Sequence, residues 1–145
     1  MKIYAHRGFC GKFPEGSRTA YEEAVKIGAD GIECDVRFTR DGTLVCFHDA
    51  TTERITGKSG RVSRLSLAQM RSRYDLITLE ELISFAISNK VNLLIETKHP
   101  VPQGRKVERE VLQLLDGKNN EIQARDRKST RLNSSHEWIS RMPSS

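Results

Sequence analysis

The chain has 145 residues, of which 37% are apolar and 30% charged, and a formal net charge of +5. This composition is typical of one globular domain, and no apolar run approaches the ~20 residues that cross a bilayer. Residues 124–145 hold five of the 24 bases and two of the 19 acids, which leaves 19 bases against 17 acids, or +2, elsewhere. This near-neutral body argues against a nucleic-acid partner. The first five residues leave no room for a signal peptide before a polar motif, so we expect a cytoplasmic protein.

The first 48 residues alternate between strand and helix patterns. They predict a strand at 2–6, a helix at 17–27, a strand at 30–38 and a strand at 43–48. Ser17 can cap the helix and Gly28 can end it. Only the turn at 41–42 separates the second and third strands, which is too short for a helical crossover. We therefore predict a hairpin that brings His48 roughly across from Glu33.

The second half continues the alternation. It predicts helices near 67–73 and 79–89, a strand at 91–96 and a helix at 105–115 that Gly117 ends. The first two helices open on capping boxes, Ser66 with Gln69 and Thr78 with Glu81. Residues 51–64 have the composition of a polar loop. Strands that alternate with helices predict an α/β layer or barrel.

Glu33 and Asp35 share one face of the strand predicted at 30–38. Neighbouring carboxylates repel each other and are costly to desolvate unless a cation compensates them. A solvated strand face is the alternative, and it is the more frequent meaning of such a pair taken alone. His48 and Asp49 follow an apolar strand and offer a proton carrier with a supporting carboxylate. A structural histidine next to a loop cap is the alternative for these two.

Two further strand ends carry polar motifs. His6, Arg7 and Gly8 place an imidazole, a guanidinium and a flexible residue after the first strand, and the guanidinium fork suits a phosphate. Glu96 and Lys98 end the fourth strand with an acid and a base on one face, for which an exposed ion pair is the alternative. Each motif is weak alone. Because all four lie at strand ends, where α/β folds carry chemistry, we predict metal-assisted phosphodiester hydrolysis.

Three segments resemble the signature blocks of the glycerophosphodiester phosphodiesterases. They are HRGFCGKFPEGS, GADGIECDVRFTRDGTLVCFHD and LLIETK, and their order and spacing agree across residues 3–98. The resemblance implies a TIM-type (βα)8 barrel, a divalent cation, Mg²⁺ or Ca²⁺, and a small-molecule substrate. The implied reaction hydrolyses glycerophosphodiesters to sn-glycerol 3-phosphate and an alcohol. Cleavage of inositol phospholipids or sphingomyelin is the enzymatic alternative.

The resemblance also implies roles by position. It assigns metal binding to Glu33, Asp35 and Glu96, acid–base catalysis to His6 and His48, and phosphate contacts to Arg7 and Lys98. Glu15 matches the acid of the family's Pro-Glu-Asn-Thr block. Asp49 is expected from its place after His48, and not from the resemblance, to be a supporting residue. That block reads Pro-Glu-Gly-Ser here, so Gly16 stands in place of the asparagine. The stretch between His48 and Thr78 is short for the family.

The length of the chain differs from that of a barrel. A TIM barrel has ~250 residues and eight strands, whereas residues 1–123 predict about four strands, or half a barrel. Residues 124–145 have neither helix nor strand period, resemble translated vector sequence and are expected to be disordered. We expect residues 1–123 to be the N-terminal part of a barrel, inactive or impaired by itself. The alternative is a short non-catalytic half-barrel that binds metal or self-associates through open sheet edges.

Overall fold

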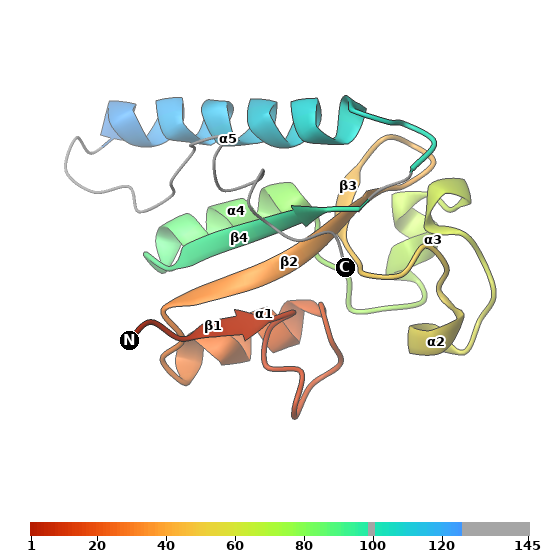
Figure 1. The fold of residues 1–145 in the computed structure, drawn as a ribbon, viewed down its shortest axis with the longest axis horizontal. Helices are drawn as coiled ribbons and strands as arrows, with labels where there is room; N and C mark the ends of the chain where they lie inside the picture. The colour runs from red at the N-terminus through yellow and green to blue at the C-terminus, as the bar shows by residue number, and fades with distance from the viewer. Residues whose placement is uncertain (99–100, 126–145) are drawn as a thin grey trace.

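A computed structural model describes residues 1–98 and 101–125, which form one sheet with helices packed against it (Figure 1). The strands are β1 Tyr4–His6, β2 Gly31–Phe38, β3 Leu44–Cys46 and β4 Asn92–Thr97. The helices are α1 Arg18–Lys26, α2 Glu53–Thr56, α3 Leu67–Arg71, α4 Leu79–Ser88 and α5 Lys106–Arg125, with a 3₁₀ helix, η1, at Val62–Arg64. The predicted alternation of strands and helices is confirmed.

β2 is the centre of the sheet. β1 pairs with it in parallel, which places His6 level with Glu33. β4 also pairs with it in parallel, which places Glu96 level with Asp35. Helices α1 and α4 carry the chain between these parallel strands, as expected for βαβ units. The carboxyl ends of β1 and β4 therefore point in one direction and bring their polar motifs to the same region.

β3 completes the predicted hairpin, because it pairs with the end of β2 in the antiparallel sense. The segments that follow β1 and β3 contact the same edge of β2. The N–H of Arg7 donates to the carbonyl of Glu33 at 3.1 Å, and the N–H of Phe47 donates to the carbonyl of Asp35 at 2.9 Å. Alternate carbonyls of a strand point to the same side. The hairpin therefore returns His48 towards the turn that contains Arg7.

The main core lies between the sheet and helices α1, α4 and α5 (Figure 1). Ile32, Cys34 and Val36 alternate along β2 and pack in this core with at most 1% exposure. Glu33 and Asp35 occupy the positions between them, and these residues are buried as well. β2 is thus covered on both faces, as strands of parallel sheets usually are.

A second core lies under residues 47–77, which join β3 to α4 and are called the excursion below. The sequence predicts a polar loop over much of this segment, but the structure has α2 and η1 there. The buried side chain of Val62 and the partly buried side chain of Ile55 pack into this second core, which gives the segment an apolar side. The other buried members of this core are Val45, Phe47, Leu65, Met70 and Leu76.

Helix α5 is longer than the sequence predicts. It was expected to end at Gly117, but it continues to Arg125. A glycine inside a helix costs only about 1 kcal/mol relative to alanine, so it does not by itself end one. The predicted domain boundary at residue 123 lies inside α5, and residues 126–145 of the predicted tail lie outside the described residues. None of the helices in the described ranges is long and apolar enough to span a bilayer.

The predicted capping box at the start of α4 gives a test of local stability. Thr78 Oγ1 accepts a hydrogen bond from the N–H of Glu81 at 3.2 Å, and the Glu81 carboxylate accepts one from the N–H of Thr78 at 3.0 Å. Thr78→Ala should lower the free energy of unfolding by about 1 kcal/mol because it leaves a helix N–H unpaired. Thr78→Ser should keep most of the stability. Urea unfolding measures both, and an equal loss in the two variants would contradict the capping role.

Candidate active site

Three acidic side chains converge near the carboxyl ends of the parallel strands. Glu33 and Asp35 come from β2, and Glu96 comes from β4. One carboxylate oxygen of each residue lies within 4.8 Å of the others. The three residues are 6%, 2% and 6% exposed, which excludes the solvated strand face as their explanation. A cluster of hard oxygen donors is the kind of site that binds a divalent cation.

The electrostatics of Glu33 support the same reading. Burial, reinforced by the nearby carboxylates of Asp35 and Glu96, raises the pKa of Glu33 to about 7. Its Oε1 atom is buried and has no hydrogen-bond partner among the described residues. A buried carboxylate oxygen without a partner is costly. These residues therefore fit a divalent cation, which would supply the missing partner.

The His-Arg-Gly motif forms a tight turn after β1. Arg7 has φ +57° and Gly8 has φ +80°, and positive φ is uncommon for a residue with a side chain. The N–H of Arg7 also donates to Oε2 of Glu33 at 3.1 Å, which ties the turn to the acidic cluster. A Cβ atom on Gly8 would lie 2.6 Å from the carbonyl carbon of Ala20 in α1. Only glycine fits here, because the turn and the helix approach so closely.

Two basic side chains lie against the acidic cluster. Arg7 Nε lies 3.1 Å from Asp35 Oδ2, in an ion pair whose angles are not those of a hydrogen bond. Arg7 Nη1 donates to Glu15 Oε2 at 2.8 Å. Lys98 Nζ lies 2.9 Å from Asp35 Oδ1 and 2.5 Å from Glu96 Oε1. Lys98 is 5% exposed, so the exposed ion pair is excluded as well.

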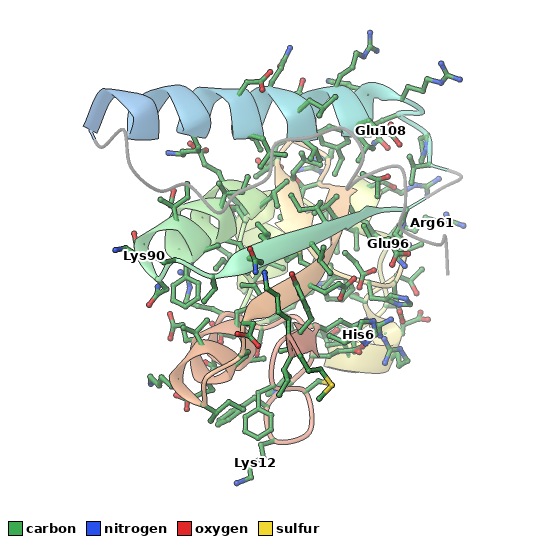
Figure 2. The ribbon with its side chains drawn as sticks, turned by 60° about the vertical axis from the view of Figure 1, so that its left-hand side comes forward. His6, Lys12, Arg61, Lys90, Glu96 and Glu108 are labelled. Atoms are coloured by element: carbon green, nitrogen blue, oxygen red, sulfur yellow. The ribbon has the colours of Figure 1, made fainter. Side chains whose placement is uncertain are left out.

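The two predicted catalytic histidines have different surroundings. His48 Nδ1 lies 2.7 Å from Asp49 Oδ1, which leaves its Nε2 as the nitrogen available to a ligand. His6 Nε2 lies 3.7 Å from Glu33 Oε2, and the side chain of His6 is 64% exposed. Figure 2 shows His6 and Glu96 on the same side of the molecule. One imidazole is therefore anchored by a carboxylate and the other is accessible at the rim.

Two arginines were not predicted. Arg54, in α2, donates to both carboxylate oxygens of Asp49 at 2.8 and 2.9 Å and also to Glu15. Hydrogen bonds from Arg54, helped by one from His48, lower the pKa of Asp49. Arg37 Nε donates to the carbonyl of His48 at 2.8 Å. The alternation of β2 could have pointed to Arg37, but no spacing rule pointed to Arg54 because its segment has the composition of a loop.

The structure brings all nine predicted site residues into one network. Direct contacts join His6, Arg7, Glu15, Glu33, Asp35, Glu96 and Lys98, while His48 contacts Asp49. A small cavity connects the two groups, because Arg7, Glu15, Asp35 and His48 all line it. Arg54 provides a second connection through its bonds to Glu15 and Asp49.

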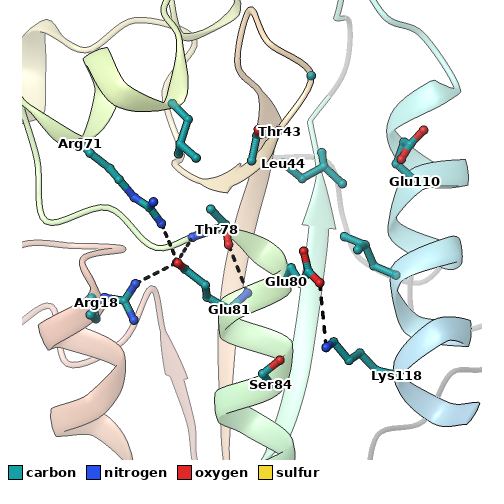
Figure 3. Close-up of a pocket in the computed structure, with 13 residues that line it drawn as sticks. Arg18, Thr43, Leu44, Arg71, Thr78, Glu80, Glu81, Ser84, Glu110 and Lys118 are labelled. Atoms are coloured by element: carbon teal, nitrogen blue, oxygen red, sulfur yellow. Dashed lines mark hydrogen bonds and ion pairs between the residues drawn. The ribbon is translucent and has the colours of Figure 1, made fainter. Parts of the chain in front are cut away.

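A larger hollow of about 760 Å³ lies between α4, α5 and the β2–β3 turn, and it contains none of the predicted site residues (Figure 3). Arg18 and Arg71 donate to Glu81 there at 2.8 and 2.6 Å, and Lys118 lies 3.9 Å from Glu80. These charges are paired across an open surface. We therefore place the candidate active site at the smaller cavity, where the buried carboxylates lie.

Comparisons with known proteins identify related sequences and structures. The model of the glycerophosphoryl diester phosphodiesterase family matches residues 6–140. The probable glycerophosphodiester phosphodiesterase 1 of Mycobacterium tuberculosis is 42% identical over 132 residues, which cover 78% of this chain and 48% of that protein. The chain thus spans about half the length of the curated relatives it matches.

Solved structures show the same fold. The glycerophosphodiester phosphodiesterase of Agrobacterium tumefaciens is 29% identical, with a TM-score of 0.64 over 79% of this chain and 53% of its own. The enzyme of Thermotoga maritima gives a TM-score of 0.71 at 24% identity, over 91% of this chain and 61% of its own. The parallel strands β1, β2 and β4 and their helices are part of a TIM-type barrel, as the family resemblance implies. The chain belongs to the glycerophosphoryl diester phosphodiesterase family.

Proposed function

We propose that this site hydrolyses glycerophosphodiesters to sn-glycerol 3-phosphate and an alcohol, with a divalent cation, Mg²⁺ or Ca²⁺, on Glu33, Asp35 and Glu96. One observation carries the proposal: three buried carboxylates lie within 4.8 Å of one another with Arg7 and Lys98 against them. Membership of the family supports the reaction. A small-molecule substrate and a cytoplasmic location, as expected from the sequence, belong to the same proposal.

The basic residues would orient the phosphate. Glu33, Asp35 and Glu96 would hold a divalent cation, whose positive charge would offset the negative charge of the phosphoryl group. Arg7 offers a planar set of donors, and its contact with Asp35 holds that set at the edge of the acidic cluster. Lys98 adds a compact positive charge on the other side of Asp35. Together they would hold the phosphate next to the carboxylates and offset part of the negative charge there.

The histidines would move the protons. One imidazole accepts the proton of the attacking hydroxyl, which belongs to water or to the substrate, and the other protonates the leaving alkoxide. His48 is suited to either role because Asp49 fixes its Nδ1 and leaves Nε2 available. His6 lies beside Glu33 at the exposed rim, where a leaving alcohol can diffuse away. Glu15 and Asp49 support Arg7 and His48 from behind.

Self-association is a second candidate, favoured by the edges of the sheet. Within the described ranges, the outer edges of β1 and β4 have no strand partner, because both strands pair only with β2. Unpaired edges promote pairing with another chain. Light scattering after size exclusion tests this, and a monomer at all concentrations would contradict it.

Glu33 gives a test of the cation site that does not depend on turnover. Its pKa rises from 4.5 to about 7 on folding, so the folded, cation-free protein binds the proton more tightly than the unfolded chain. Stability should therefore fall as the pH rises from about 4.5 through about 7, and Glu33→Gln should lack this dependence. Chemical unfolding in EDTA measures the difference. Above pH 7, Mg²⁺ or Ca²⁺ should raise the melting temperature of the parent chain and not that of Glu33→Gln.

The exposed carboxylate of Glu80 on α4 provides the matched control, because its side chain is 63% exposed and lines the larger hollow, which contains none of the acidic cluster. Glu80→Gln should keep both the pH dependence and the stabilisation by the cation. A cation response that survives Glu33→Gln unchanged would reject the assigned ligands.

The two histidines provide the test of the reaction. His6→Ala and His48→Ala should each lower the turnover of glycerophosphocholine by at least about 100-fold, because each removes one proton-transfer group. Both variants should keep the stabilisation by the cation. Lys90→Met, at the opposite end of the sheet in Figure 2, is the control. Full activity in either histidine variant would contradict the proposal, and faster cleavage of an inositol phospholipid or sphingomyelin would favour the related specificity.

A further inference from the structure

Arg54 reaches from the excursion into the candidate active site. Its Nε and Nη2 atoms lie 2.8 and 2.9 Å from the two carboxylate oxygens of Asp49, a bidentate arrangement. The same Nη2 also donates to Oε1 of Glu15. One guanidinium therefore holds two carboxylates that are 34 residues apart in the sequence and belong to different segments.

Each of these carboxylates holds one residue that the proposed reaction uses. Glu15 uses its other oxygen, Oε2, to accept from Arg7 Nη1 at 2.8 Å, and Arg7 in turn contacts Asp35. Asp49 holds His48 Nδ1 at 2.7 Å. A continuous chain of ion pairs and hydrogen bonds therefore runs from the acidic cluster to His48, and Arg54 is its central member.

The segment that carries Arg54 is firmly attached to the rest of the structure. Arg73 Nη1 donates to the carbonyl of Ser59 at 2.7 Å and to Thr52 Oγ1 at 3.2 Å, at the two sides of α2. Ile55, next to Arg54, packs against the second core. Tyr74, also in the excursion, donates from its hydroxyl to the carbonyl of Glu15 at 2.6 Å. Two residues of the excursion therefore hold Glu15: Tyr74 binds its main-chain carbonyl and Arg54 binds its side-chain carboxylate.

We propose that Arg54 is a positioning residue that fixes the phosphate-contacting Arg7 and the proton-carrying His48 relative to each other by joining Glu15 to Asp49. This inference rests on the proposed function. One side chain has to bind two carboxylates here. The planar guanidinium of arginine offers several donors in fixed directions, whereas the ammonium of lysine is a single compact charge and cannot reproduce that geometry. A displacement of about 1 Å in such a group lowers the rate by roughly 100-fold.

A merely structural role would give a different result. The side chain of Arg54 is 53% exposed, and exposed ion pairs contribute little to stability. Arg71 offers a matched control, because it donates to Glu81 at 2.6 Å and is 42% exposed, but lies at the larger hollow away from the site. If Arg54 acts only as a surface ion pair, Arg54→Met and Arg71→Met should behave alike.

The experiment compares Arg54→Met, Arg54→Lys and Arg71→Met in the full chain with Mg²⁺ or Ca²⁺ present. Arg54→Met should lower kcat for glycerophosphocholine by about 10- to 100-fold and weaken binding of sn-glycerol 3-phosphate by about tenfold, at a melting temperature close to that of Arg71→Met. Arg54→Lys should recover part of the affinity and little of kcat. Equal kinetics in Arg54→Met and Arg71→Met would overturn the proposal.

A second measurement separates this inference from the proposed function. Glu15→Gln and Asp49→Asn should be coupled by at least about threefold in the unfolding equilibrium constant, and the coupling should disappear in Arg54→Met. If the parent chain shows no turnover, as expected of half a barrel by itself, the kinetic comparison gives no result and the double-mutant cycle alone decides the connection. Additive effects of Glu15→Gln and Asp49→Asn in the parent chain would overturn the role of Arg54.

Discussion

The burial of acidic side chains on β2 is the constraint on which the site depends. A strand covered on both faces normally carries apolar residues, and Glu33 and Asp35 break that rule at its centre. Their charges require compensation, which Arg7 and Lys98 provide in part from the positions directly after β1 and β4. When Glu33 is ionised, two bases against three carboxylates leave a net negative centre. This excess of negative charge favours a bound cation at the site.

The sheet topology delivers the compensating groups to this point. β1 and the hairpin strand β3 contact the same edge of β2, so the segments that follow them face each other over the carboxylates. The turn after β1 has positive φ at Arg7 and Gly8, and the absence of a side chain on Gly8 lets this turn pack directly against α1. A position of unusual backbone conformation beside the candidate ligands is typical of a functional site.

The excursion, residues 47–77, adds a second apolar core to the sheet and its helices. Its own apolar core holds α2 in place and allows a half-exposed arginine to act as a fixed connection between two carboxylates. The energetic value of such contacts lies less in stability, where exposed ion pairs are weak, than in geometry. A short segment thereby links the phosphate side of the site to the histidine side.

The sequence by itself determined the alternation of strands and helices, the capping boxes and the hairpin, because these depend on local periodicity and turn length. Strand-end motifs and the family resemblance named the residues that the structure brings together in the candidate site. The sequence could not determine that Glu33, Asp35, Glu96 and Lys98 are buried, since burial depends on what packs over the strand. It misjudged the end of α5 at Gly117, where the penalty of one glycine is small. Only the tertiary structure brought Arg54 to Glu15 and Asp49, because a contact between distant segments leaves no period in the sequence.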